Sequence, residues 1–125
     1  MKKFFIIISD SLFCATSLFA KWEKISESDN FQLYIDKSTL AERNNLKYVW
    51  TMLNNKNKDE DYQSRKAQMI LDCDLGRSKA LNLFFYEGFM GNGKIIRKYT
   101  NIDMKWRSLV PDSIGYKIVK EVCNK

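Results

Sequence analysis

Few residues of this chain have side chains suited to catalysis, because its 125 residues include no histidine and only three cysteines. A serine or cysteine nucleophile normally needs a histidine as its general base, so acyl-transfer chemistry is not expected. Paired carboxylates such as Glu87 and Asp103 could serve a glycosidase, but a domain this small has little room for a sugar cleft. We therefore predict that the protein is not an enzyme and has no catalytic, cofactor-binding or metal-binding residues.

The segment from Gly88 to Lys94 has the glycine and lysine spacing of a phosphate-binding P-loop. A P-loop also needs Ser or Thr after its lysine, to hold magnesium, and a helix whose N-terminus faces the phosphates. Ile95 stands in that position, and the residues from Ile95 to Tyr99 favour a strand. We interpret the segment as a hairpin with Asn92-Gly93 as its tight turn, because both residues tolerate positive φ.

The N-terminal residues predict export from the cell. Two lysines follow the initiating methionine, and an apolar stretch then runs to the small residue Ala20, ahead of polar Lys21. This is the layout of a secretory signal peptide, so we predict a signal at residues 1–20 and a mature domain at residues 21–125. An uncleaved membrane anchor is disfavoured, because Asp10 near the middle of the apolar stretch would cost about 3 kcal/mol in a bilayer.

Export would leave two cysteines, Cys73 and Cys123, in an oxidising compartment. The third, Cys14, falls in the signal and follows a bulky phenylalanine, whereas a lipidated cysteine normally follows a small residue. An even number of cysteines in about a hundred residues predicts one structural disulfide. The alternatives are a free redox couple and a metal site, but zinc would need two further ligands.

The elements that must position these cysteines follow from the hydrophobic period. Apolar and polar residues alternate at 31–36, 47–52 and 64–74, and an apolar run at 81–86 precedes the hairpin. A period of two predicts strands. Residues 54–61 contain no apolar side chain and predict a solvated loop. These patterns predict a single antiparallel sheet of about five to six strands in meander order.

The C-terminal segment changes to a helical period. After Pro111, either Asp112 or Ser113 can cap a helix whose apolar residues lie on one stripe, namely Ile114, Ile118, Val119, Val122 and Cys123. Cys73 shares the apolar face of its strand with Ala67, Met69 and Leu71. A Cys73–Cys123 bond would therefore staple the helix to the sheet, which completes a predicted α+β fold.

Basic residues gather around the two central hairpins, within a chain of formal net charge +6. They are either solvated strand faces and edges or a patch for heparin-like glycans and anionic cell surfaces. Nucleic acid is a poor candidate partner for an exported chain. The candidate residues are Arg65, Lys66, Arg77, Lys79, Lys94, Arg97 and Lys98.

Large side chains occupy both faces of the predicted strands, as Phe84 between Leu83 and Phe85 shows. One short helix covers only one face of a sheet. We therefore expect the sheet either to curl on itself or to pair with a second copy, forming a homodimer, or with another partner.

An ordered series of residues in the mature chain resembles the surface-adhesin protein E family of Gram-negative bacteria. The resemblance covers nearly all of residues 21–125, and it implies a small exported protein whose C-terminal helix is tied to an antiparallel sheet by a disulfide. It also implies binding of host extracellular-matrix or plasma proteins at the outer-membrane surface. The alternative is a periplasmic accessory protein that binds another envelope component. The series consists of Trp22, Tyr34-Ile35-Asp36, Tyr48-Val49-Trp50, Ser64, Leu71-Asp72-Cys73, Met90-Gly91-Asn92-Gly93, Trp106, Pro111-Asp112-Ser113 and Cys123.

The last residue, Lys125, suggests one particular host ligand. Kringle domains, such as those of plasminogen, recognise an ammonium together with a carboxylate, and a C-terminal lysine supplies both groups. A disulfide at Cys123 would hold this end of the helix firmly. The alternative is a chance ending that favours the helix dipole. We therefore add Lys125 to the candidate residues and plasminogen to the candidate partners.

Overall fold

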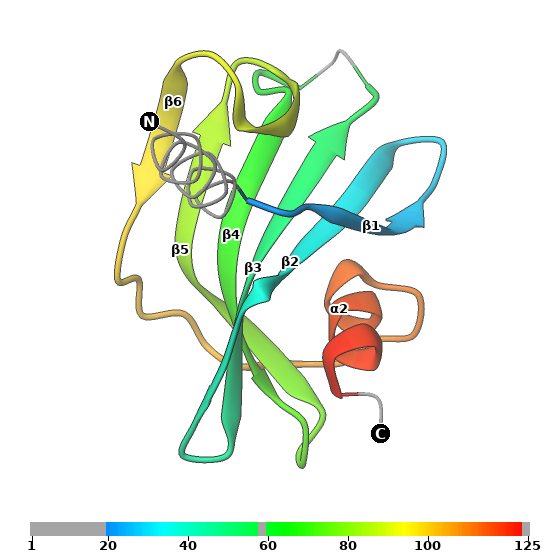
Figure 1. Ribbon diagram of the computed structural model, residues 1–125, viewed down its shortest axis with the longest axis vertical. Coiled ribbons are helices and arrows are strands. Elements are labelled where there is room, and N and C mark those ends of the chain that lie inside the picture. The colour runs from blue at the N-terminus through cyan, green and yellow to red at the C-terminus, as the bar shows by residue number, and fades with distance from the viewer. Residues whose placement is uncertain (1–19, 58–59, 124–125) are drawn as a thin grey trace, which may run out of the picture.

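The computed structural model describes residues 20–57 and 60–123, so nearly all of the predicted signal peptide lies outside the described residues. Six strands form one antiparallel sheet in which each strand pairs with the next along the chain, and Figure 1 shows this twisted sheet with the helix beside it. The predicted meander with a C-terminal helix is confirmed. The elements are β1 (Glu23–Glu27), β2 (Phe31–Arg43), β3 (Leu46–Asn55), β4 (Ser64–Asp72), β5 (Arg77–Tyr86), η1 (Phe89–Gly91), β6 (Ile95–Tyr99), β7 (Arg107–Ser108) and α2 (Ile114–Cys123).

The sheet has one extra, very short strand. β7 pairs with the first residues of β5, and β6 pairs with the last ones, so the two share the same edge of β5. The chain between them therefore runs along that edge before it reaches α2, as Figure 1 shows. No helix in the described part of the chain has the length and apolar character that crossing a bilayer requires.

The helix begins and packs as its sequence predicts. Ser113 is the cap, since its Oγ accepts a hydrogen bond of 3.1 Å from the backbone N–H of Tyr116. The side chains of Ile118, Val119 and Val122 are buried, and they form one core with side chains of β2, β3 and β4. We call the side of the sheet that α2 packs against the helix face. Its buried sheet residues are Leu33, Ile35, Val49, Leu53 and Leu71.

The predicted disulfide is confirmed. Cys73, which directly follows β4, is bonded to Cys123 at the end of α2, with the two Cα atoms 5.7 Å apart. The bond closes 50 residues of chain and ties the last turn of the helix to the sheet. The end of the helix therefore has a fixed position on the helix face.

A wide irregularity bends β2 in its middle. Asp36 lies opposite Trp50 and Ala41 lies opposite Tyr48, so four residues of β2 have only Val49 to face them. Within this bulge the Asp36 carboxylate accepts hydrogen bonds from the backbone N–H and the hydroxyl of Ser38. Bulges of this kind increase the local twist of a sheet, which agrees with the bent course of β2 in Figure 1.

The predicted tight turn at Asn92-Gly93 is wrong in detail. The hairpin between β5 and β6 is wider, because residues 89–91 form the 3₁₀ turn η1 and Asn92 has an extended backbone with φ of −90°. Gly93 has the positive φ expected of it, and the other positive φ angles of this hairpin occur at Met90 and Gly91. A Cβ atom at Gly91 would lie 3.1 Å from the Met52 side chain, so glycine also permits the close approach of this turn to the sheet.

The predicted solvated loop at residues 54–61 also begins too early. Asn54 and Asn55 belong to β3 and are buried. The Asn54 carboxamide accepts a hydrogen bond from the N–H of Met90, and the Asn55 carboxamide donates one to the carbonyl of Tyr62. Both side chains are therefore satisfied inside the protein, which a count of polar residues does not reveal.

Candidate functional site

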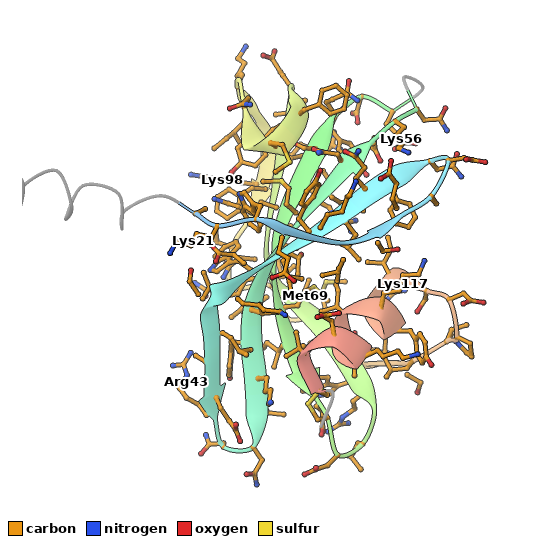
Figure 2. The ribbon with its side chains drawn as sticks, turned by 45° about the vertical axis from the view of Figure 1, so that its right-hand side comes forward. Lys21, Arg43, Lys56, Met69, Lys98 and Lys117 are labelled. Atoms are coloured by element: carbon orange, nitrogen blue, oxygen red, sulfur yellow. A yellow bond between two sulfur atoms is a disulfide. The ribbon has the colours of Figure 1, made fainter. Side chains whose placement is uncertain are left out.

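The structure divides the predicted basic residues between the two faces of the sheet. Successive side chains on a strand point to opposite faces, so the neighbours Arg65 and Lys66 on β4 are separated. Arg65 lies on the helix face with Arg97, and Lys66 lies on the other face with Lys98. Figure 2 shows Lys98 on the opposite side of the sheet from Lys117 of α2. The seven residues therefore do not form one patch.

We call the side of the sheet that faces away from α2 the open face. η1 folds over one end of it, and the described part of α2 leaves its middle uncovered. The half-buried or exposed side chains that remain accessible there combine aromatic rings with cations. They are Tyr34, Arg43, Tyr48, Trp50, Lys66, Arg77, Lys79, Phe84, Lys98 and Trp106.

Lys66 occupies the centre of the open face. Its ammonium nitrogen lies 5.3 Å from the centre of the Trp50 ring and 5.6 Å from that of Phe84. Phe84 pairs with Lys66 on one side and with Lys98 on the other, so the row alternates cation, aromatic ring and cation. Such contacts hold the methylene stem of a lysine against apolar surface and leave its charge available to a partner.

Two further cation and aromatic groups extend the open face. The guanidinium of Arg77 and the ammonium of Lys79 lie 4.5 Å and 4.7 Å from the ring centre of Trp106, which precedes β7. The guanidinium of Arg43 lies 4.5 Å from the ring centre of Tyr48. Sequence reasoning missed Arg43. The adjacent Asn44-Asn45 is a signal for a two-residue hairpin turn, and such a turn would have placed Arg43 beside β3.

The remaining candidates are placed differently. Arg97 on the helix face pairs with Asp61 at 2.6 Å, and this contact holds the pKa of the Asp61 carboxyl below its usual value. Lys94 lies in the loop after η1, where its backbone N–H donates to the Glu87 carboxylate. Arg65 lies on the helix face and is half-buried. Lys125 lies outside the described residues.

The chemistry that this arrangement supports is surface contact. Within residues 20–57 and 60–123, no three side chains of the types that bind metals gather into a cluster. The open face presents rings and cations, which are enriched in protein interfaces and attract acidic surfaces. By fold and surface the protein thus falls in the class of small β-sheet proteins with a broad accessible contact face.

Comparison with known proteins identifies the group within this class. The sequence profile described as "Surface-adhesin protein E" matches residues 22–124. The chain therefore belongs to the surface-adhesin protein E family, and membership of this family implies a surface-exposed protein. No curated protein sequence matches the chain.

Solved structures of Haemophilus influenzae protein E share the fold. Crystal form II of that protein is 19% identical to this chain, with a TM-score of 0.58 over 85% of this chain and 89% of that one. Protein E from non-typeable Haemophilus influenzae, also 19% identical, has a TM-score of 0.54 over 85% of this chain and 77% of that one. At this identity the likeness establishes the fold.

Proposed function

We propose that the protein is a non-enzymatic adhesin that binds host extracellular-matrix or plasma proteins at the bacterial cell surface through the open face. The observation that carries the proposal is the uncovered row of Lys66, Phe84 and Lys98 beside Trp50. Aromatic residues form most of the strong anchors in protein interfaces, and cations around them steer acidic partners. Family membership supports the same function.

The proposal is tested with the exported protein and a basement-membrane extract or purified plasminogen on a biosensor surface. The variant Lys66→Gln/Lys98→Gln removes two charges from the open face. We expect it to weaken binding by about tenfold or more, and we expect binding of the wild type to weaken with added salt.

A matched control removes two charges from the helix. Lys117 and Lys120 lie on α2, so Lys117→Gln/Lys120→Gln makes the same change in net charge elsewhere. We expect this variant to bind like the wild type, and circular dichroism should show both variants folded. Equal weakening in both pairs would indicate a general charge effect and contradict the role of the open face.

The terminal lysine is a separate proposal about plasminogen. If Lys125 engages a kringle domain, deleting it or adding a lysine analogue should abolish plasminogen binding and leave the melting temperature unchanged. Binding that survives the deletion would reject this mechanism. The open-face variant distinguishes the two routes, because it should not affect a contact made only by the chain terminus.

Localisation tests the whole proposal. Protease added to intact cells should degrade a surface adhesin, while a cytoplasmic marker protein stays intact. Full protection of the protein in intact cells, with degradation after the outer membrane is opened, would instead indicate a periplasmic protein that binds another envelope component.

A further inference from the structure

A cavity of about 600 Å³ lies on the helix face, at the part of the sheet that α2 does not cover. It is bounded by β4 and β5, by the N-terminal end of α2 and by residues 104–110, which run along the edge of β5. Its volume is within the range of sites that bind small molecules. It lies on the other side of the sheet from the open face, and of the open-face residues named above it shares Lys79 alone.

Half of the residues that line the cavity have apolar side chains. Its floor consists of Ala67 and Met69 on β4 and of Ala80 and Leu83 on β5. Figure 2 shows Met69 between the sheet and the helix. The opposite walls add the apolar side chains of Met104, Leu109, Val110 and Ile114. Surface of this kind suits a hydrocarbon chain.

The charged residues of the cavity all have one sign. Arg65, Lys105 and Arg107 contribute to the lining, as does Lys79, whose ammonium lies over Trp106 on the open face, and no aspartate or glutamate does. Ser113 and Gly115 at the N-terminal end of α2 also line it, and the partial positive charge of a helix N-terminus adds to the same potential. The cavity is therefore built to attract an anion.

Arg65 gives the position of that anion. Its Nε is buried, and no group among the described residues accepts a hydrogen bond from it. Its neighbours across the strands are Leu53 and Phe85, and the carboxylate of Asp61 pairs with Arg97. Burial lowers the pKa of Arg65, but a guanidinium remains charged in proteins. A buried N–H without an acceptor is unfavourable, so the Nε of Arg65 favours a ligand that can accept a hydrogen bond from it.

We propose that this cavity binds a fatty acid, with the carboxylate on the Arg65 guanidinium and the acyl chain along the floor between β4 and β5. A carboxylate can take two parallel hydrogen bonds from a guanidinium, one of which would satisfy the Nε of Arg65. The floor from Arg65 to Met69 spans four residues, or about 14 Å, which suits a medium-length acyl chain.

The experiment titrates dodecanoate into the exported protein, below the concentration at which it forms micelles, and measures heat and melting temperature. We expect saturable binding at one site per chain. Dodecanol has the same chain without the charge, and its affinity should be lower by about tenfold or more. Butyrate has the charge without the chain, and its affinity should be lower by a similar factor.

Two variants locate the site. Arg65→Met removes the guanidinium and should weaken dodecanoate binding about tenfold or more, while Arg97→Met removes a guanidinium from the same face outside the cavity and should change it less than about twofold. Because Arg65→Met could disturb folding, Ala80→Leu provides a second test by filling the floor. Ala80→Leu should also weaken dodecanoate binding. Butyrate should not raise the melting temperature of either variant.

Several outcomes would overturn the proposal. They are the absence of saturable dodecanoate binding, equal binding of dodecanol, or equal effects of Arg65→Met and Arg97→Met. Tighter binding of a phosphate-headed lipid than of dodecanoate would reject the fatty acid as the ligand. None of these results depends on adhesion, because the Lys66→Gln/Lys98→Gln variant should bind dodecanoate like the wild type.

Discussion

Individual buried polar residues hold the turns of this protein in place. The Ser64 side chain, which is 0% exposed, donates a hydrogen bond of 2.6 Å to the carbonyl of Gly88 and accepts one of 2.9 Å from the N–H of Gly91. Asn54 binds the N–H of Met90 in the same way. These two side chains therefore give η1 its position over the sheet.

The variant Ser64→Ala tests this role. It would remove the hydrogen bonds to the Gly88 carbonyl and the Gly91 N–H, which lie in partly buried residues, so we expect the free energy of unfolding to fall by about 1 to 3 kcal/mol. Chemical denaturation measures the change. Thr100→Ala, at an exposed position, serves as the control and should have little effect. Equal stability of Ser64→Ala and the wild type would contradict this account of η1.

Glu27 makes the stability of the protein depend on pH. Hydrogen bonds to its carboxylate from Lys24, then Lys56 and Gln32, lower its pKa to about 2. The folded state thus favours the ionised form more than the unfolded state does, where the pKa is about 4.3. The resulting stabilisation is present above that value and is lost as the pH falls towards 2.

Thermal unfolding at pH 6 and at pH 3 measures this effect. Glu27→Gln should lose less stability than the wild type between the two values, by a small amount because these side chains are solvent-exposed. The control Glu42→Gln removes a carboxylate that has no ion pair within the described part of the chain. Identical acid sensitivity of the wild type and Glu27→Gln would refute the prediction.

Among the elements, α2 depends most on its link to the sheet. It has ten residues, which is too short for a stable isolated helix, so its order comes from packing and from the Cys73–Cys123 bond. The disulfide also closes a loop that includes β5, β6 and β7. The disulfide should therefore stabilise these strands as well as the helix.

The double variant Cys73→Ser/Cys123→Ser should reduce the free energy of unfolding by about 4 kcal/mol, as the chain-entropy model predicts for a loop of this length. Differential scanning calorimetry provides the measurement. The wild type treated with a reductant should melt like the double variant. If the reduced wild type kept its original melting temperature, the bond would not be a stabilising staple.

At the scale of the whole molecule, the position of Lys21 suggests how the chain is processed. The backbone nitrogen of Lys21 donates a hydrogen bond of 3.3 Å to the carboxylate of Asp36, which is 3% exposed. If the signal is cleaved after Ala20, this nitrogen becomes the N-terminal ammonium. The hydrogen bond would then be assisted by charge, which makes it stronger.

We expect the exported protein to begin at Lys21, and intact-mass measurement would show this directly. Asp36→Asn should also cost about 1 kcal/mol more in a protein that begins at Lys21 than in one that begins two residues earlier, where the nitrogen is an amide. An N-terminus at another residue, or equal costs in both proteins, would contradict the prediction.

The sequence by itself determined which elements form and how they are tied. Alternation with a period of two is a local property of a strand, and the stripe from Ile114 to Cys123 is a local property of a helix, so both are readable without a structure. The disulfide followed from two cysteines in a chain whose N-terminal residues predict export. Even the separation of Arg65 from Lys66 was implicit, because adjacent residues on a strand face opposite ways.

Only the tertiary structure decided which face the helix covers and what the bulges and buried polar residues do. The bulge after Asp36 shifts the register of β2, and Asn54 reaches a partner 36 residues away at Met90. The buried Nε of Arg65, which has no acceptor among the described residues, likewise became visible only when β4, β5 and α2 were assembled. Such contacts join residues distant in the chain, and no local pattern specifies them, because their free energy arises from burial in the assembled fold.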